Sequence, residues 1–364
     1  MTCLFNMLID PWGTESLEKY EHIFDKFGLS RFPEEYSKKL NNYLFDRGLV
    51  IAHRDFDKVL ARIEEKKPFI NMTGIATSGS FHLGHKLDVD IFKFFKSLNA
   101  KNYFSIADID GYTSRPKIKS MDEAKELAVD NLSHVLALGL SKKDVYVQSR
   151  KEPEYYTLTL EISKKITENM FKAVYGHLDV GKLAANLLQY ADILHTQLKA
   201  YEGKMPSITG IGLDQDPHAK LCRDIAKRLP YDFEVPSFLY FRHQGGLKEG
   251  AKMSSSNPDT AIFLSDDLEE VKKKLKKAFS GGRDSLEEHR KLGGIPEKDR
   301  AYEILLFHHP KTKFVEGIYH DYKSGKLLSG ELKEICLEWL LEFLRKHQAK
   351  AKKDEAVARK MVYG

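Results

Sequence analysis

Two histidines stand three residues apart at the start of an apolar run with helical spacing. The segment reads Phe81-His82-Leu83-Gly84-His85, so the first turn of a helix would place both rings on one face. The unpaired N–H groups and the positive dipole end of a helix N-terminus favour an anion there. Gly84 leaves room for a flat ligand against the backbone. Two ordinary surface histidines are the alternative, but the pattern suits a nucleotide triphosphate.

A second polar segment, 252–256, has the composition of a phosphate-binding loop. It reads Lys252-Met253-Ser254-Ser255-Ser256, with glycines at 245, 246 and 250 before it. A lysine supplies a point charge and serine hydroxyls supply small donors, which together suit the tail of a triphosphate. We therefore expect this segment to act together with the two histidines.

Further polar residues follow two expected strands. Asp110 comes just after the apolar run 103–107, whereas Gly212, Asp214 and Gln215 end or follow the run 207–212. Open α/β sheets bind ligands at the carboxyl ends of their strands. We expect Gly212 to let a ribose or adenine approach, and Asp214 or Gln215 to bind hydroxyls or an ammonium group.

The elements that position these residues read as a doubly wound parallel α/β sheet. Strands are expected near 69–72, 103–107, 145–147 and 207–212, and an amphipathic helix follows the first strand with Leu87, Ile91 and Phe95 on one face. The alternation of strand and helix favours a parallel sheet. A short helix is expected near 36–44, long helices at 153–201, and a helix after Asp216, which looks like its N-cap.

The pair HLGH and KMSSS resembles the signature motifs of class I aminoacyl-tRNA synthetases. The loop at 212–218, GLDQDPH, and the stretch at 280–290, SGGRDSLEEHR, resemble tryptophanyl-tRNA synthetases of the archaeal and eukaryotic type. The resemblance extends from Asp10 to about His347. It implies a Rossmann-like catalytic domain with a helical insertion, and an α-helical C-terminal domain that binds the anticodon.

The resemblance also implies an activity and its site residues. ATP and L-tryptophan would form a tryptophanyl-adenylate, Mg²⁺ would accompany the ATP with no metal held by the protein, and tRNA(Trp) would accept the amino acid. The catalytic residues would be His82, His85, Lys252, Ser254 and Ser256. ATP would be bound by Thr73, Gly74, Gly84, Gly212, Asp214, Lys252 and Met253. Arg283 and Asp284 would contact tRNA.

The expected pocket for the amino acid departs from the archaeal and eukaryotic pattern. These relatives carry tyrosine where Met72 stands and glutamine where Ile106 stands, and use both to hold the indole. Residues 188–194 instead resemble a helix of bacterial tryptophanyl-tRNA synthetases whose aspartate binds the ring nitrogen. We expect Asp192 to accept the indole N–H, since that nitrogen can only donate. The expected amino-acid-binding residues are Asp192, Gln189, Gln215 and Asp110.

The helix that carries Asp192 is expected over 182–200 with two distinct faces. Its core face would hold Leu183, Leu187, Leu194 and Leu198. A stripe exposed to solvent is the alternative interpretation of the second face, which comprises Ala185, Gln189, Asp192 and Thr196. The KMSSS segment departs as well, because Ser255 replaces a lysine and leaves Lys252 as the segment's only cation.

Composition and length set the remaining expectations. The chain has 364 residues and a net charge of +5, which suits a polyanionic partner; tRNA is expected, and DNA is not. The three cysteines are isolated, and we find neither a signal peptide nor an apolar run of membrane-spanning length. We expect a cytoplasmic homodimer without membrane contact. The expected divisions are an N-terminal extension at 1–60, a catalytic domain at 61–265 with its helical insertion at about 115–203, and an anticodon-binding domain at 266–364.

Three rival functions remain open on the sequence. Tyrosyl-tRNA synthetase is the nearest, and the SGGRD stretch at 280–284 favours tryptophan over tyrosine. A small HxGH nucleotidyltransferase would have no use for the KMSSS segment. A tRNA-binding relative without catalysis would have lost the signature residues, which are all present.

Overall fold

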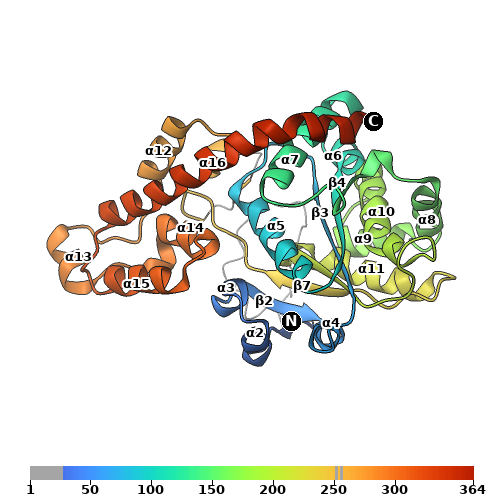
Figure 1. Ribbon diagram of the computed structural model, residues 1–364, viewed down its shortest axis with the longest axis horizontal. Helices are drawn as coiled ribbons and strands as arrows, with labels where there is room; N and C mark the ends of the chain where they lie inside the picture. The colour runs from blue at the N-terminus through green and yellow to red at the C-terminus, as the bar shows by residue number, and fades with distance from the viewer. Residues whose placement is uncertain (1–27, 251–252, 255–256) are drawn as a thin grey trace, which may run out of the picture.

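The computed structural model describes residues 28–250, 253–254 and 257–364. Within them, seven strands form one sheet in the order β1-β2-β7-β6-β3-β4-β5 (Figure 1). The strands are β1 (Ser30–Arg31), β2 (Val50–Arg54), β3 (Ile70–Ala76), β4 (Lys101–Ala107), β5 (Val145–Val147), β6 (Ser207–Gly212) and β7 (Ser237–Phe241).

Five neighbouring strands, from β7 to β5, run parallel, which confirms the predicted doubly wound sheet. β3 is the first of the five in the chain and lies between β4 and β6, so the chain order reverses direction on its two sides. Such a switch point opens a crevice at the carboxyl ends of the strands. The four strands expected from the sequence are confirmed, whereas β7 was not predicted.

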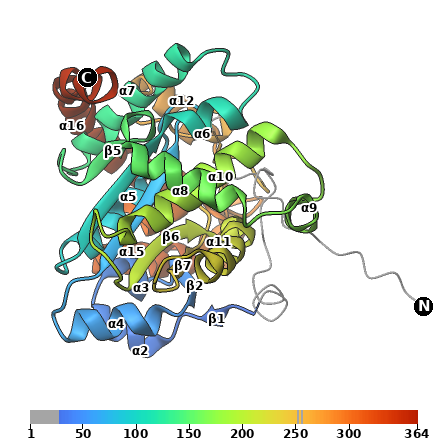
Figure 2. The same cartoon turned by 90° about the vertical axis from the view of Figure 1, so that its right-hand side faces the viewer.

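Helices cover both faces of the sheet. Successive side chains of β7 point to opposite faces of the sheet. Leu239 and Phe241 pack in the apolar cluster with α5 on one face, and Phe238 and Tyr240 pack in the cluster with α10 and α11 on the other. Figure 2 looks onto the second of these faces. The helices up to β6 are α2 (Glu34–Leu40), α3 (Tyr43–Asp46), α4 (Phe56–Glu64), α5 (Leu83–Lys96), α6 (Asp108–Ser114), α7 (Met121–Ala137), α8 (Pro153–Ser163), α9 (Glu168–Tyr175) and α10 (Val180–Leu194).

The N-terminal part adds an antiparallel edge to the sheet. β2 pairs antiparallel with β7, so residues 50–54 belong to the sheet, and the expected division after residue 60 falls inside α4. The single helix expected near 36–44 is wrong. Asn41 adopts a left-handed conformation with φ of 45° and separates α2 from α3.

The expected helical insertion needs correction. Its range of about 115–203 includes β5, an edge strand of the sheet, so the all-helical connection lies between β5 and β6 and contains α8, α9 and α10. The helix expected over 182–200 ends at Leu194 and continues as a 3₁₀ turn, His195–Gln197. Its expected core face is partly wrong, because Leu183 and Leu187 are half-buried. Ala185, Asp192 and Thr196 are buried, so that side of the helix is no solvent stripe.

Apart from β7, the regular elements after β6 are helical, and the part from residue 266 onward is helical as expected. The chain after β6 contains α11 (Asp216–Arg228) beside the sheet and then α12 (Leu268–Lys277), α13 (Leu286–Leu292), α14 (Arg300–His308), α15 (Thr312–Lys323) and α16 (Ser329–Tyr363). α16 runs from this helical part back onto α7 (Figure 1). One apolar core continues across residue 265, joining Leu83 and Val89 to Leu340 and Leu344. In the described parts of the chain, no helix is long and apolar enough to cross a membrane.

Candidate active site

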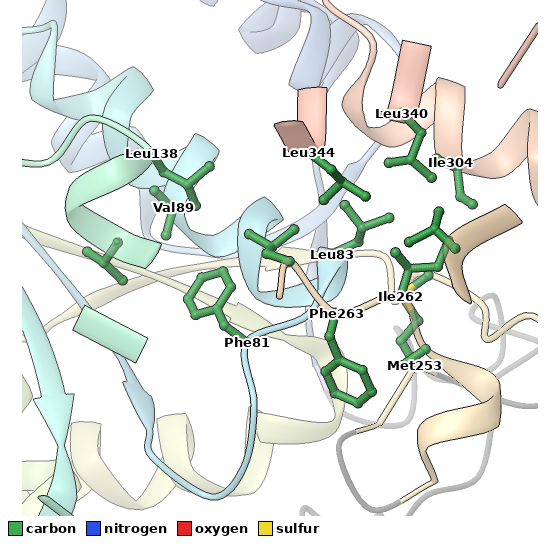
Figure 3. Close-up of a cluster of buried hydrophobic side chains, with 14 of the residues drawn as sticks. Phe81, Leu83, Val89, Leu138, Met253, Ile262, Phe263, Ile304, Leu340 and Leu344 are labelled. Atoms are coloured by element: carbon green, nitrogen blue, oxygen red, sulfur yellow. The ribbon is translucent and has the colours of Figure 1, made fainter. Parts of the chain in front are cut away.

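A short backbone pairing brings the two signature segments together. Leu83 donates to the carbonyl of Ile262 at 3.1 Å, and Leu264 donates to the carbonyl of Phe81 at 2.8 Å. Figure 3 shows Leu83 and Ile262 in one apolar cluster with Met253. The chain that follows the KMSSS segment is thereby fixed beside the start of α5, and Met253 and Ser254 line the same cavity as the two histidines.

The two histidines cap α5 with their own rings. Nδ1 of His82 accepts from the Gly84 N–H at 3.1 Å, and Nδ1 of His85 accepts from the His82 N–H at 3.3 Å. A backbone N–H can only donate, so neutral rings held in this way carry their protons on Nε2. The rings stack with centroids 3.8 Å apart. Burial lowers the pKa of His85 to about 4, which keeps that ring neutral at ordinary pH.

A cavity of about 350 Å³ lies at the carboxyl ends of the parallel strands. It brings together residues that the sequence analysis singled out in six separate segments. Those that line it are Thr73, Gly74, His82, Gly84, His85, Asp110, Gln189, Asp192, Gly212, Asp214, Gln215, Met253 and Ser254. Lys252 and Ser256 lie outside the described residues.

Three glycines of this cavity are required by close packing. A Cβ on Gly74 would lie 2.6 Å from Cβ of Ser105, and one on Gly84 would lie 2.9 Å from the His82 ring. A Cβ on Gly212 would lie 2.5 Å from the His243 ring and 2.7 Å from the Asp214 carboxylate. Contacts within the protein therefore already favour glycine at these positions, whether or not a ligand also approaches the backbone there.

Asp192 lies at the centre of a buried hydrogen-bond network. Its Oδ1 accepts from the Tyr146 and Tyr155 hydroxyls, both at 2.7 Å, and its Oδ2 accepts from Gln148 at 3.0 Å and from Ser105 at 3.2 Å. Burial raises its pKa to about 7, and the two tyrosine hydroxyls oppose that rise. A carboxylate offers about four lone-pair positions. An indole N–H would therefore replace a present donor, and Ser105 makes the longest contact and also lines the cavity.

The remaining cavity carboxyls differ in their surroundings. Nε2 of His243 lies 2.8 Å from Oδ1 of Asp214. Burial, with Asp214 nearby, raises the pKa of Asp88 well above its ordinary value. Burial also raises the pKa of Asp110 to about 6, while Ser114 donates to its carboxylate at 3.1 Å. These groups make one wall of the cavity rich in acceptors.

Asp216 is not the N-cap of α11. Gln215 holds that position, and Asp216 is the first helical residue. Its buried carboxylate instead pairs with the Arg54 guanidinium at 2.9 and 3.1 Å and accepts from the Tyr240 hydroxyl at 2.7 Å. The carboxylate thus ties β2 and β7 to α11.

Sequence reasoning missed several residues of the site. Gln148 directly follows β5, so the strand-end rule applied to β4 and β6 would have found it. Asp88 follows His85 by three positions on α5, and helical spacing would have indicated it. No sequence signal marked Ser105 or Arg115, which line the cavity.

The SGGRD stretch lies away from the cavity, in the helical part. Its glycines are packed tightly: a Cβ on Gly281 would lie 2.0 Å from the carbonyl oxygen of Ile295. Nε of Arg283 donates to the Gly293 carbonyl at 2.8 Å, although the side chain is exposed. Asp284 is also exposed. The two predicted tRNA-binding residues are therefore separate from the predicted adenylate site.

Comparison with known proteins gives matches along nearly the whole chain. A family model described as tRNA synthetases class I (W and Y) matches residues 64–345. The tryptophan–tRNA ligase of Aeropyrum pernix is 38% identical, with 97% of each chain covered. That of Methanocaldococcus jannaschii is 37% identical, with 98% of this chain and 99% of the relative covered. The crystal structure of the Aeropyrum pernix synthetase superposes with a TM-score of 0.88 at 38% identity, covering 97% of this chain and 98% of that one.

Proposed function

The chain belongs to the class I tRNA synthetases of the tryptophan and tyrosine group, and we propose that it ligates L-tryptophan to tRNA(Trp). The observation that carries the reaction is the single cavity in which the HLGH histidines, Ser254 and the strand-end residues meet. The choice of tryptophan over tyrosine is supported by the relatives of similar length, which are named as tryptophan–tRNA ligases.

The first step is an in-line displacement at phosphorus. An oxygen of the tryptophan carboxylate bonds to the α-phosphorus of ATP, the bond to the bridging oxygen breaks, and pyrophosphate leaves with the electron pair. Positioning and charge stabilisation carry such chemistry, so no nucleophile of the enzyme is needed. The Nε2–H groups of His82 and His85 donate to the phosphates. Lys252, Ser254 and Ser256 hold the leaving pyrophosphate.

The nucleoside and the amino acid occupy opposite parts of the cavity. Thr73, Gly74, Gly84, Gly212, Asp214 and Met253 surround the adenosine. Gln189, Gln215, Asp110 and Asp192 surround tryptophan, whose indole N–H donates to Asp192. In the second step the ribose hydroxyl at the tRNA 3′ end attacks the carbonyl carbon and AMP leaves. Arg283 and Asp284 contact the tRNA outside the cavity.

Mg²⁺ enters as part of the ATP substrate. Among the described residues, no group of three or more His, Cys, Asp or Glu side chains is arranged to hold a metal ion. Oxygens of the triphosphate and water supply the ligands of Mg²⁺.

A homodimer in the cytoplasm is the form we propose for this enzyme. Apolar side chains are exposed on the helices between β5 and β6, with Leu160 70% and Val180 74% exposed, and a partner subunit would cover them. Cys222 and Cys336 are buried free thiols, which fits a reducing compartment.

ATP–pyrophosphate exchange, run separately with tryptophan and with tyrosine, tests the proposal. We expect exchange that depends on tryptophan, with tyrosine lower by several decades in kcat/KM. Exchange supported equally by tyrosine would refute the assigned substrate. The absence of exchange with either amino acid, in a folded protein that binds tRNA, would refute the assigned reaction.

A further inference from the structure

Arg115 is a cation in the wall of the catalytic cavity to which neither signature motif assigns a role. It follows the last residue of α6, and its side chain is half-buried. Among the described residues that line the cavity, only Arg115 and Arg242 carry a permanent positive charge. The same lining contains four aspartates, so a bound triphosphate needs cations in addition to the two histidines.

A close contact places α6 against the loop before α5. A Cβ on Gly111 would lie 2.7 Å from the carbonyl oxygen of Thr77, so the helix backbone touches the loop that leads to His82. Arg115 is the C-cap residue of α6, four positions after Gly111, and has an extended backbone conformation. Ser78 of that loop, His82 and Arg115 all line the cavity. Arg115 therefore lines the same cavity as the start of α5.

The second cation, Arg242, is directed elsewhere. Its guanidinium lies 4.0 Å from the buried carboxylate of Glu303 and 6.0 Å from the centre of the Phe307 ring, both on α14. Lys86 of the HLGH helix pairs with Asp90 and does not line the cavity. The KMSSS segment contains Lys252 as its only cation, because Ser255 is uncharged. Arg115, by contrast, comes from the end of α6 and lines the cavity with Ser78 and His82.

We propose that Arg115 is a catalytic residue that binds the β- and γ-phosphates of ATP and stabilises pyrophosphate as it leaves. The inference deepens the proposed function and rests on it. When the tryptophan carboxylate bonds to the α-phosphorus, the electron pair of the breaking P–O bond goes to pyrophosphate. The planar guanidinium offers two parallel donors to phosphate oxygens. Burial lowers the pKa of Arg115, and the nearby Asp110 carboxyl partly opposes this effect. A phosphate that binds to the guanidinium would therefore replace solvation that the cation has lost.

The experiment compares Arg115→Met and Arg115→Lys with Arg228→Met. Arg228 is an exposed arginine on α11, paired with Asp224, and serves as the matched control. Urea unfolding midpoints come first, followed by the binding of ATP, AMP and pyrophosphate by calorimetry, and then tryptophan-dependent exchange. AMP lacks the phosphates that Arg115 is proposed to hold, so it separates this contact from the adenosine site.

We expect Arg115→Met to weaken the binding of ATP and pyrophosphate at least tenfold while AMP binds as in the wild type. The kcat of exchange should fall about two to three decades, as for the loss of one preorganised donor, with Arg115→Lys in between. Equal losses for AMP and ATP, or behaviour like that of Arg228→Met, would overturn the proposal. If Arg115→Met does not fold, the same ratio of ATP to AMP binding in Arg115→Lys decides. The binding measurements contain no tryptophan, so they test the contact of Arg115 with ATP separately from the reaction. A wild type that shows no exchange would therefore count against the proposed function and not against this contact.

Discussion

Replacing Asp192 tests the recognition of the indole most directly. In Asp192→Ala the ring N–H loses its proposed acceptor, and the protein loses the group on which four of its own donors converge. In Asp192→Asn one acceptor oxygen is kept. The two substitutions therefore separate recognition of the indole from support of the fold.

The structure gives a magnitude to each effect. Above about pH 7, where Asp192 is ionised, a hydrogen bond to this charged group contributes about 1.5–3 kcal/mol, so Asp192→Ala should lower kcat/KM for tryptophan about one to two decades. The Tyr155 hydroxyl also donates to the Leu188 carbonyl at 3.0 Å, whereas the other neighbours of the Tyr146 hydroxyl are Ser105 and the Met72 sulfur, the latter at 3.9 Å. One stranded buried donor costs about 1–3 kcal/mol of unfolding free energy.

Asparagine should be tolerated better than alanine. Its amide nitrogen fits the Oδ1 position, because both tyrosine hydroxyls there can accept a hydrogen bond. Its oxygen then stays at the Oδ2 position, where Gln148 and Ser105 donate. We expect kcat/KM to fall less than tenfold in this variant.

The assay is ATP–pyrophosphate exchange over a range of tryptophan concentrations, together with calorimetric binding of tryptophan and urea unfolding. Tyr155→Phe is the control, since Tyr155 bonds to Asp192 but does not line the cavity. It should cost stability with little change in kcat/KM. Should a folded Asp192→Ala bind tryptophan as tightly as the wild type, the reasoning is refuted, and Gln189 becomes the next candidate acceptor.

Four further outcomes are expected. Ser105→Ala should keep or lower the KM for tryptophan, since the indole would replace that hydroxyl; a tenfold rise would show that Ser105 orients Asp192. Lys252→Ala should lower the kcat of exchange about two to three decades with little change in the KM for tryptophan, and exchange at the wild-type rate would exclude the segment from catalysis. Alanine at Arg283 or Asp284 should weaken tRNA charging and leave exchange intact, whereas equal damage to both would indicate a structural role. Finally, the pKa of Asp192 is about 7 in the folded protein and 3.8 ordinarily, so its contribution to the free energy of unfolding declines as pH rises between these two values. Asp192→Asn removes this titration and should show a flatter dependence of unfolding free energy on pH. Identical slopes for the variant and the wild type would contradict the raised pKa.

The parallel core of the fold was predictable because its signals are local. Apolar runs ending in polar residues mark β4 and β6, and the run after His85 has the period of a helix. β7 escaped prediction because all its residues are buried, so it shows no alternation of apolar and polar residues. β2, which lies between the edge strand β1 and β7, escaped because its longer pairing is with β7, far along the chain.

The site was predictable as a set of residues, but its geometry was not. Spacing placed His82 and His85 on one turn, whereas the reciprocal capping through their Nδ1 atoms depends on ring orientation. Asp192 was found from a local resemblance. Its donors come from β4, β5, the turn after β5 and α8, and only the folded sheet brings these segments together.

The distribution of positive charge follows from the same geometry. A lysine at position 255 would add a cation to the KMSSS segment, and Ser255 lacks it. Arg115 supplies a charge from α6, whose backbone is fixed against the loop before the HLGH helix by the Gly111 contact. A cation fixed in the fold was desolvated when the protein folded, so little reorganisation remains when pyrophosphate leaves. A fixed cation in the wall of the cavity would add to the single lysine of this segment, and this is the role that we propose for Arg115.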